Sequence, residues 1–408
     1  MKKSISLLAL ASILAAGSAY ASGYRIPEQS PDSVAKAGAH IASATGANSS
    51  YYNPANMAWA ENAWLGELDF TYIHLTSIDY QDYRSPALSG SSEDENFLLP
   101  TFFAVSPDYR NFRFGLSFTG PYGLAKRWND WYPALTAKEF ELKVFDLNPV
   151  VSYKINDYLS LAGGVRMIMA TATARNGGTN PSNGVTYQLD LEGDWSVDWG
   201  YNLAVAVRPC KGANISATYR SNVDMGLSGD AFVATSSPMP LAINTTGDVD
   251  LPAPAVFTLA ASYSWEDLTV EVAWDRTFWD EYEALDFNFG NPLLEASLFG
   301  APRPKDWDNT DAFRISASYK FNEAFTGMAG FAVDQNPVPE EYLSFELPDS
   351  DAWLYAIGVR YAVNEKTDVT LGALYDYKES REVTNSIIVG EFTDAAAILI
   401  SAGVSYKF

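Results

Sequence analysis

The feature that most constrains this chain is a two-residue alternation of side chains that recurs from about residue 64 to the last residue. Over residues 353–361, one face carries Trp, Tyr, Ile, Val and Tyr, and the other carries Leu, Ala, Gly and Arg. Successive side chains of a β-strand point to opposite faces. An apolar face tipped with aromatic rings suits lipid, and a small or charged face suits the interior of a barrel.

The same alternation recurs in other segments, and connections of two lengths separate them. Aromatic-tipped strands are predicted at 268–275, 313–321, 368–377 and 398–408. Short connections rich in Asn, Asp, Gly and Pro, which favour tight turns, lie at 107–108, 156–157, 209–212, 266–267, 322–323 and 364–365. Long connections lie near 76–95, 122–137, 175–185, 233–244, 280–305, 336–350 and 383–389.

This arrangement predicts an all-β fold, a transmembrane antiparallel β-barrel of about fourteen strands over residues 64–408. Short turns at one end and long loops at the other are typical of outer-membrane barrels. A soluble β-sandwich would also alternate, but its buried faces would rarely be tipped so regularly with Tyr and Trp.

The N-terminus has the pattern of an export signal. Two lysines precede an apolar run at 5–16, and an Ala-Tyr-Ala pattern follows it. We expect a signal peptide over 1–21, cleaved near Ala21, so that the mature chain begins at Ser22. The apolar run is too short to span a bilayer as a helix. The predicted location is the outer membrane of a Gram-negative cell, and a secreted all-β enzyme is the alternative.

Charge and residue counts exclude several classes of partner and site. The net charge of -23 argues against nucleic acid, whose phosphates require a basic surface. Cys210 is the single cysteine, so no intrachain disulfide forms. With only two histidines, no His-rich metal site is expected, and no motif implies a cofactor. The acidic loop clusters Glu93-Asp94-Glu95 and Asp280-Glu281-Glu283 are interpreted as solvated charge, with calcium or lipopolysaccharide bridging as the alternative.

Residues 22–63 differ from the rest of the chain. They are rich in Ala and Gly between residues 35 and 47 and end in Tyr-Tyr-Asn-Pro-Ala-Asn-Met at 51–57. A segment with so few large side chains needs an enclosure in which to pack. We therefore interpret it as a plug, or hatch, inside the barrel lumen, with a short soluble cap domain as the alternative.

Several motifs, in this order, resemble the FadL/TodX family. They are Gly-Tyr-Arg-Ile-Pro-Glu-Gln-Ser at 23–30, Ala-Gly-Ala at 37–39, Asn-Pro-Ala at 53–55, the segments 217–221 and 229–231, Trp-Asp-Asn-Thr-Asp at 307–311, and 334–339 with 347–351. The resemblance covers essentially the mature chain. It implies an outer-membrane channel, not an enzyme, that takes up hydrophobic molecules passively. Long-chain fatty acids are the first candidate cargo, aromatic hydrocarbons the alternative, and the protein is expected to be a monomer.

The end of the chain carries a second resemblance. Ile400, Ala402, Val404, Tyr406 and the terminal Phe408 share one face. This resembles the C-terminal strand recognised by the barrel-assembly machinery, which would be a partner alongside the lipid bilayer and lipopolysaccharide.

The third predicted strand contains residues that interrupt a regular ladder. Gly115, Gly120, Pro121 and Gly123 lie within 114–124, and Gly and Pro in a strand mark a bulge, a bend or the strand's end. The resemblance implies a kink here that leaves a lateral opening beside the hatch. The residues that follow, Ala-Lys-Arg-Trp at 125–128, depart from the family's more acidic or polar pattern.

The hatch motif Asn53, Pro54 and Ala55 is expected to be the gate of that opening, since the ring of Pro54 restricts φ to near -65°. If the cargo is a carboxylate, a cation should lie where its head group stops. Arg166 and Arg314 are the candidates, on lumen faces near mid-barrel. The alternative is that they pair with lumen acids such as Glu271 or Asp275.

Two other function classes remain open from the sequence. A general diffusion porin would lack the N-terminal plug and begin its first strand soon after the signal peptide. An outer-membrane hydrolase would need a serine beside a histidine base, and nothing near His74 suggests such a pair.

Overall fold

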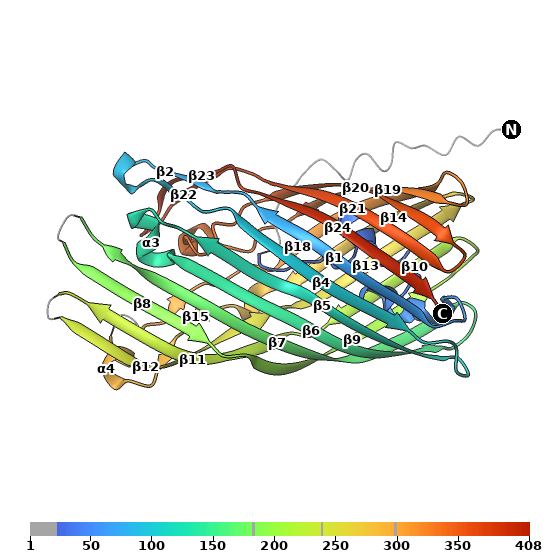
Figure 1. The fold of residues 1–408 in the computed structure, drawn as a ribbon, viewed down its shortest axis with the longest axis horizontal. Coiled ribbons are helices and arrows are strands. Elements are labelled where there is room, and N and C mark those ends of the chain that lie inside the picture. The colour runs from blue at the N-terminus through green and yellow to red at the C-terminus, as the bar shows by residue number, and fades with distance from the viewer. Residues whose placement is uncertain (1–22, 182–183, 238–239, 298–299) are drawn as a thin grey trace.

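The computed structural model describes residues 23–181, 184–237, 240–297 and 300–408, so the predicted signal peptide and its cleavage site lie outside the described residues. It shows a closed antiparallel barrel of fourteen strands (Figure 1), which confirms the predicted fold class. The barrel strands are β1 (Leu65–Leu75), β4 (Glu95–Val105), β5 (Phe112–Arg127), β6 (Glu139–Lys154), β7 (Leu159–Thr179), β9 (Ser196–Val207), β10 (Ala213–Arg220), β13 (Ala255–Trp265), β14 (Leu268–Phe278), β18 (Thr310–Lys320), β19 (Phe325–Asp334), β20 (Ala352–Asn364), β21 (Thr367–Lys378) and β24 (Ala396–Lys407).

The barrel closes because the first strand pairs with the last. Leu65 lies opposite Lys407 and Leu75 opposite Ala397 in the β1–β24 ladder. The predicted tight turns join β4 to β5, β6 to β7, β9 to β10, β13 to β14, β18 to β19 and β20 to β21. These turns gather at the same end of the barrel as the C-terminus (Figure 1).

The opposite end carries longer structures. The strands β8 (Thr186–Gly193), β11 (Val223–Thr235), β12 (Leu241–Ala253) and β16 (Asn288–Phe289) extend the sheet beyond the barrel. β8, β11 and β12 project at the left of Figure 1. A loop sheet contains β2 (Asp79–Asp82), β3 (Gly90–Ser91), β22 (Arg381–Thr384) and β23 (Val389–Thr393), and β15 (Ala284–Leu285) pairs with β17 (Arg303–Pro304). The loop helices are α3 (Trp131–Ala137), α4 (Pro292–Glu295), η3 (Pro86–Leu88), η4 (Trp279–Glu281) and η5 (Glu340–Tyr342).

Several loop boundaries were wrong in the sequence analysis. The long connection predicted at 122–137 is shorter, because β5 continues to Arg127 and residues 131–137 form α3. Likewise β7 continues to Thr179 and β11 to Thr235. These strands extend past the barrel because they pair there with β8 and β12.

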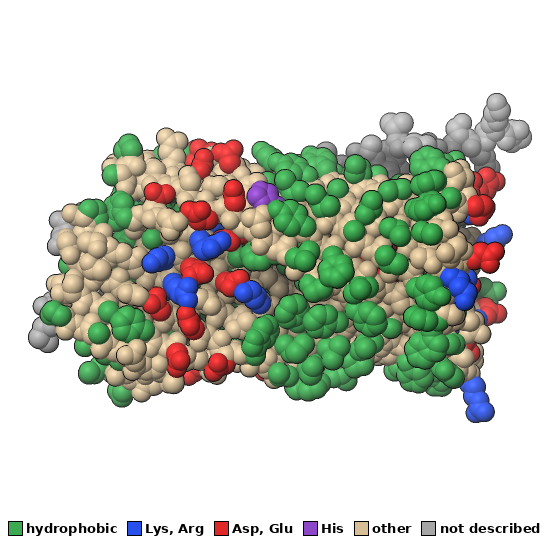
Figure 2. Space-filling view, viewed as in Figure 1, with side chains coloured by type: hydrophobic (Ala, Val, Ile, Leu, Met, Phe, Trp, Pro, Cys, Tyr) green, Lys and Arg blue, Asp and Glu red, His purple; other side chains and the backbone are tan. Residues whose placement is uncertain are grey.

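The outward faces form an apolar band, as the alternation predicted. Ile357 is 68% exposed, whereas its neighbour Ala356 is 5% exposed. Figure 2 shows hydrophobic side chains over the half of the barrel nearer the tight turns, and charged side chains over the loop half and the turn rim. Such a band is the lipid-facing surface of an outer-membrane barrel. In the described part of the chain, no helix is long and apolar enough to cross a membrane.

The N-terminal segment, residues 23–63, lies inside the barrel. It contains α1 (Pro31–Ala35), α2 (Ser49–Tyr52) and η2 (Pro54–Trp59). α1 packs on β19, β20, β21 and β24, α2 on β4 and β5, and η2 on β5, β6, β7 and β9. Because these strands surround the lumen, the segment is enclosed by the wall on several sides.

Glycines on the wall make room for α1. A Cβ at Gly330 would lie 2.1 Å from the backbone of Lys36, one at Gly358 2.3 Å from Ala35, and one at Gly372 2.5 Å from Pro31. Any larger residue would therefore push the helix away from β19, β20 and β21.

Candidate functional site

The barrel wall is interrupted between β4 and β5. The two strands pair only from Val105 opposite Gly115 to Phe102 opposite Phe118, although both continue towards the loop end. Beyond that point β5 carries a bulge, where its pairing with β6 shifts between Thr119 and Tyr122. Pro100 lies on β4 where the pairing with β5 has ended. Proline has no N–H for a ladder and is confined to such edges and bulges, so the local sequence supports a gap.

The N-terminal segment pairs with β5 where β4 does not. The Ile26 N–H donates to the Pro121 carbonyl at 2.8 Å, and the Gly123 N–H donates to the Tyr24 carbonyl at 2.9 Å. Arg25 and Tyr122 form an antiparallel bridge between these bonds. Residues 24–26 thus pair with β5 along the edge of the gap, where β4 does not.

A cavity of about 320 Å³ lies at this gap. On the lumen side it is lined by buried leucines, including Leu354, Leu374 and Leu399. On the outer side it is lined by Leu98, which is exposed, and by Phe145, which alternates with the buried lumen residue Val144. Because residues from both faces of the wall line one cavity, an apolar molecule in it would contact the lumen and the membrane surface together.

The loop end of this cavity is charged. Lys126, from β5, is buried, and its Nζ donates to Ser92 Oγ at 3.2 Å. Among the described residues, no carboxylate lies within ion-pair distance of it. By contrast, the Nζ of Lys378 lies 2.6 Å from Asp349 Oδ1. Lys126 is therefore the cation of this cavity that a carboxylate ligand would meet without first displacing a protein acid.

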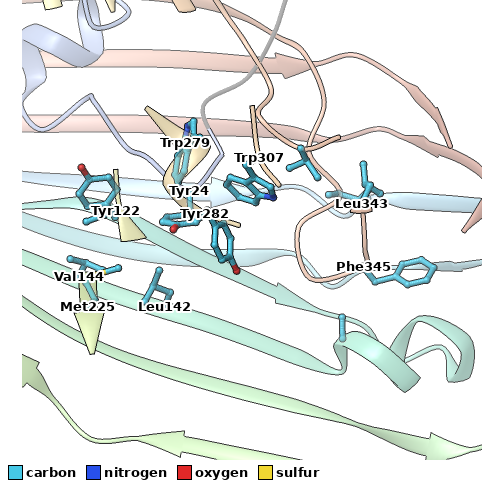
Figure 3. Close-up of a cluster of buried hydrophobic side chains, with 14 of the residues drawn as sticks. Tyr24, Tyr122, Leu142, Val144, Met225, Trp279, Tyr282, Trp307, Leu343 and Phe345 are labelled. Carbon is cyan, nitrogen blue, oxygen red and sulfur yellow. The ribbon is translucent and has the colours of Figure 1, made fainter. Parts of the chain in front are cut away.

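A smaller apolar pocket of about 70 Å³ lies between the outer loops. It shares Tyr24, Leu124, Leu142 and Leu347 with the larger cavity, so the two are adjacent. At the junction, the Tyr24 ring lies 4.7 Å from Trp279 and 5.6 Å from Trp307 between ring centroids. Figure 3 shows Tyr24, Trp279, Tyr282 and Trp307 pointing towards one another, with Tyr122 beside them.

An ion pair closes one side of the outer pocket. Lys305 binds the carboxylate of Glu346, and its Nζ also lies 3.2 Å from Ser344 Oγ. Burial by itself would raise the pKa of Glu346, but Lys305 outweighs burial and holds the pKa below its usual range. Glu346 is therefore ionised at neutral pH, and the pair leaves the rest of the pocket apolar.

The predicted gate residues lie in two places. Gly120, Pro121 and Gly123 lie at the gap, against residues 24–29. A Cβ on Gly115, outside the gap, would meet Met57 Sδ at 2.6 Å.

The hatch motif faces other strands. Asn53 Nδ2 donates to Ser216 Oγ of β10 at 2.8 Å, and Ala55 packs on Ala204 and Ala206 of β9. No described hydrogen bond joins residues 53–55 to Gly120 or Pro121, and the side chain bound to Gly120 is Gln29.

Both predicted head-group arginines are buried and bound to carboxylates. Arg314 lies 3.1 Å from Asp275, 2.8 Å from Asp334 and 3.4 Å from Glu28. Arg166 Nε lies 2.8 Å from Asp146 Oδ2. The structure therefore shows the alternative arrangement, in which both arginines form ion pairs with carboxylates of the lumen wall or of the N-terminal segment.

Polar side chains of the wall hold the N-terminal segment in place. The carboxylate of Glu271 accepts the backbone N–H groups of Ile41, Ala42 and Ser43 at 2.7, 2.9 and 2.8 Å. Asn214 Nδ2 donates to the Ala42 carbonyl at 2.8 Å. Since a loop carries unpaired backbone groups that must find partners when buried, these side chains supply the enclosure that the segment requires.

Sequence reasoning missed Lys126, Gln29 and Tyr24 as site residues. A signal was available for Lys126, because a bulge at Gly120-Pro121 shifts the alternation by one residue and turns Tyr122, Leu124 and Lys126 to the lumen. Nothing in the local pattern identifies Gln29 or Tyr24, whose partners on the barrel and loops are about 70 to 280 residues away.

Comparisons with known proteins agree with this architecture. A family model described as Outer membrane protein transport protein (OMPP1/FadL/TodX) matches residues 12–408. The Long-chain fatty acid transport protein of Salmonella typhi is 25% identical over 351 residues, covering 76% of each chain. Outer membrane protein P1 of Haemophilus influenzae is 24% identical over an alignment of 463 residues, covering 99% of each.

Two solved structures show the same fold. A Pseudomonas aeruginosa FadL homologue has a TM-score of 0.83 at 17% identity, covering 95% of this chain and 100% of its own. The P. putida toluene transporter TodX has a TM-score of 0.75 at 17% identity, covering 94% and 99%.

Proposed function

The chain belongs to the OMPP1/FadL/TodX family of outer membrane transport proteins, and we propose that it carries long-chain fatty acids from the outer loops to the membrane through the gap between β4 and β5. The observation that carries this proposal is the cavity lined by both faces of the wall, which adjoins the outer-loop pocket. Family members are transport channels, so no catalytic step is involved.

The proposed path follows apolar surface throughout. A cargo molecule first binds between the outer loops, because each buried methylene contributes about 0.8 kcal/mol. It then passes the aromatic cluster around Tyr24 and enters the larger cavity. Leaving sideways past Leu98 and Phe145, it reaches lipid without crossing water. The enclosed N-terminal segment blocks a vertical path for hydrated solutes.

Lys126 supports a carboxylate cargo over an aromatic hydrocarbon. A buried ammonium with one hydroxyl partner is costly unless another group compensates its charge. A fatty acid would place its carboxylate at Lys126 and its chain among the leucines of the cavity. A neutral aromatic molecule offers Lys126 no counter-charge.

Substitutions at the gap test the lateral route. A side chain added at Gly120 would lie 2.6 Å from Leu99 Cδ1. Gly120→Val with Pro121→Thr is therefore expected to fill the gap and restore pairing, which slows uptake of radiolabelled oleate at least tenfold. Heat-modifiable gel migration checks folding. Wild-type uptake by the folded variant would rule out lateral exit.

Two further variants separate cargo class and gate position. Lys126→Met should weaken oleate binding while leaving toluene binding unchanged, and Lys138→Met, an exposed lysine that lines neither cavity, is the matched control. Equal loss of both ligands would assign Lys126 a structural role.

Asn53→Ala with Pro54→Ala tests whether the hatch motif also contributes to gating, and it should slow uptake in a folded barrel.

A further inference from the structure

A second cavity, of about 600 Å³, lies at the turn end of the barrel. It is lined by the tight turns at 157–158 and 208–213 and by residues near the β13–β14 and β18–β19 turns. From the N-terminal segment, its wall includes Lys36, Ala42, Ser43, Thr45 and Gly46. In an outer-membrane barrel this end faces the periplasm, so the cavity is a periplasmic vestibule, distinct from the gap and the outer pocket.

A buried ammonium lines this vestibule. Lys36 is 6% exposed, and its Nζ donates to Nδ1 of His40 at 3.1 Å. Because Nδ1 accepts, the ring is neutral and its Nε2–H donates to Asn48 Oδ1 at 3.2 Å. Among the described residues, no carboxylate lies within ion-pair distance of Lys36. Burial lowers the pKa of Lys36, and Asp32 opposes that effect.

Two more cations line the vestibule from the β9–β10 turn. The guanidinium of Arg208 lies 4.3 Å over the ring of Trp59, and in the described part of the chain it has no carboxylate partner. Lys211 is exposed at the rim. Among the described residues the Arg208 guanidinium forms no hydrogen bond, so its N–H groups are available as donors to carboxylates and phosphates.

Each of the two carboxylates that line the vestibule already has a basic partner. Asp32 accepts from Arg360 and from Asn48, and Asp157 lies 2.7 Å from Lys154. Lys36, Arg208 and Lys211 therefore leave excess positive charge in this cavity, although the whole chain carries a net charge of -23. Hydroxyl groups of Ser43, Thr45, Ser262, Ser264 and Thr269 complete the lining.

We propose that the vestibule is a binding site for small oxyanions, carboxylates or phosphates, from the periplasm. Guanidinium and ammonium groups form charge-assisted hydrogen bonds with such ligands. Lys36 and Ser43 belong to the N-terminal segment, whereas Arg208 and Lys211 belong to the barrel. A bound oxyanion would therefore tie the segment to the wall. The inference is independent of the cargo proposed above.

Cys210 allows the excess positive charge of the vestibule to be tested directly. It is the single cysteine of the chain, it is exposed, and it lines the vestibule. In the purified protein, a negatively charged sulfonatoethyl methanethiosulfonate should modify it several-fold faster than the positively charged trimethylammonium reagent, after both rates are normalised to 2-mercaptoethanol. Arg208→Gln with Lys211→Gln should abolish this preference, and Arg208→Lys should keep it.

Lys366→Gln is the matched control, because it removes one charge from another tight turn, outside the vestibule. It should leave the rate ratio unchanged. A ratio near one in the wild type, or an equal change in the control, would overturn the proposal.

Binding is tested with inorganic phosphate and with succinate, each against chloride at equal ionic strength. Either ligand should slow the sulfonate reagent at Cys210 and raise the unfolding temperature, both effects being lost in the Arg208 and Lys211 double variant. An effect of phosphate alone or of succinate alone identifies the class of oxyanion. If neither acts on the folded wild type, the vestibule is not an oxyanion site.

Discussion

The side chain of Gln29 binds both backbone groups of Gly120: its Oε1 accepts the Gly120 N–H at 2.8 Å, and its Nε2–H donates to the Gly120 carbonyl at 3.0 Å. In a continuous sheet a neighbouring strand would supply such partners. Thr101 of β4 in turn donates its hydroxyl to the Gln29 carbonyl at 2.8 Å. Gln29 thus joins the two edges of the gap through the N-terminal segment.

Removing the amide of Gln29 should loosen this edge. Gln29→Leu leaves the buried N–H and C=O groups of Gly120 unsatisfied, at a cost of about 1–3 kcal/mol each. Amide hydrogen exchange over residues 117–125 should accelerate, and the temperature at which the folded gel band is lost should fall. Gln188→Leu, an exposed glutamine on β8, is the control. Unchanged exchange at 117–125 would contradict the bridging role.

Glu271 should keep the lumen closed to ions. Because its carboxylate accepts three N–H groups of residues 41–43, Glu271→Ala is expected to free that part of the segment. In planar bilayers the wild type should show no steady conductance of general-porin size, and the variant should show frequent openings. Glu266→Ala, in the exposed β13–β14 turn, should remain closed. Steady porin-like conductance in the wild type would instead favour a diffusion pore.

Arg314 should act on stability rather than on ligand affinity. Arg314→Met leaves three buried carboxylates without their shared cation, and breaking a buried pair costs about 3–5 kcal/mol. We expect a marked fall in the thermal midpoint. Arg166→Met, which leaves Asp146 with Arg220 at 3.6 Å, should cost less. A folded Arg314→Met protein with normal stability and lost oleate binding would restore Arg314 as a head-group residue.

The outer-loop pocket should tolerate mild acid. The folded-state pKa of Glu346 is depressed, so its pairing with Lys305 contributes stability above the unfolded pKa and loses it as pH falls through the folded pKa. Tryptophan fluorescence should therefore stay constant from pH 7 to 5 and change only in stronger acid. Glu346→Gln should show the acid spectrum already at pH 7, with Glu382→Gln, an exposed loop acid, as control. A transition between pH 7 and 5 in the wild type would refute the ion pair.

Local patterns predicted the wall of the barrel correctly. Trp353 to Tyr361 alternate as expected, because the faces of a strand depend only on its two-residue period. The tight turns were also correct, since Asn, Asp, Gly and Pro favour such turns locally. The loop boundaries were less accurate, because β7 and β11 are prolonged by pairing with strands distant in sequence.

The sequence by itself therefore determined the strand count, the lipid and lumen faces, and a weak point at Gly120-Pro121. Only the tertiary structure decided which segment binds the interrupted strand at Gly120-Pro121 and which buried cations have no carboxylate partner among the described residues. Gln29 meets Gly120 across 91 residues, and Arg314 meets Glu28 across 286. Such contacts depend on barrel closure and on the path of the enclosed segment. The bulge also turns Lys126 inward, so a one-residue shift in one ladder decided which cation faces the proposed cargo.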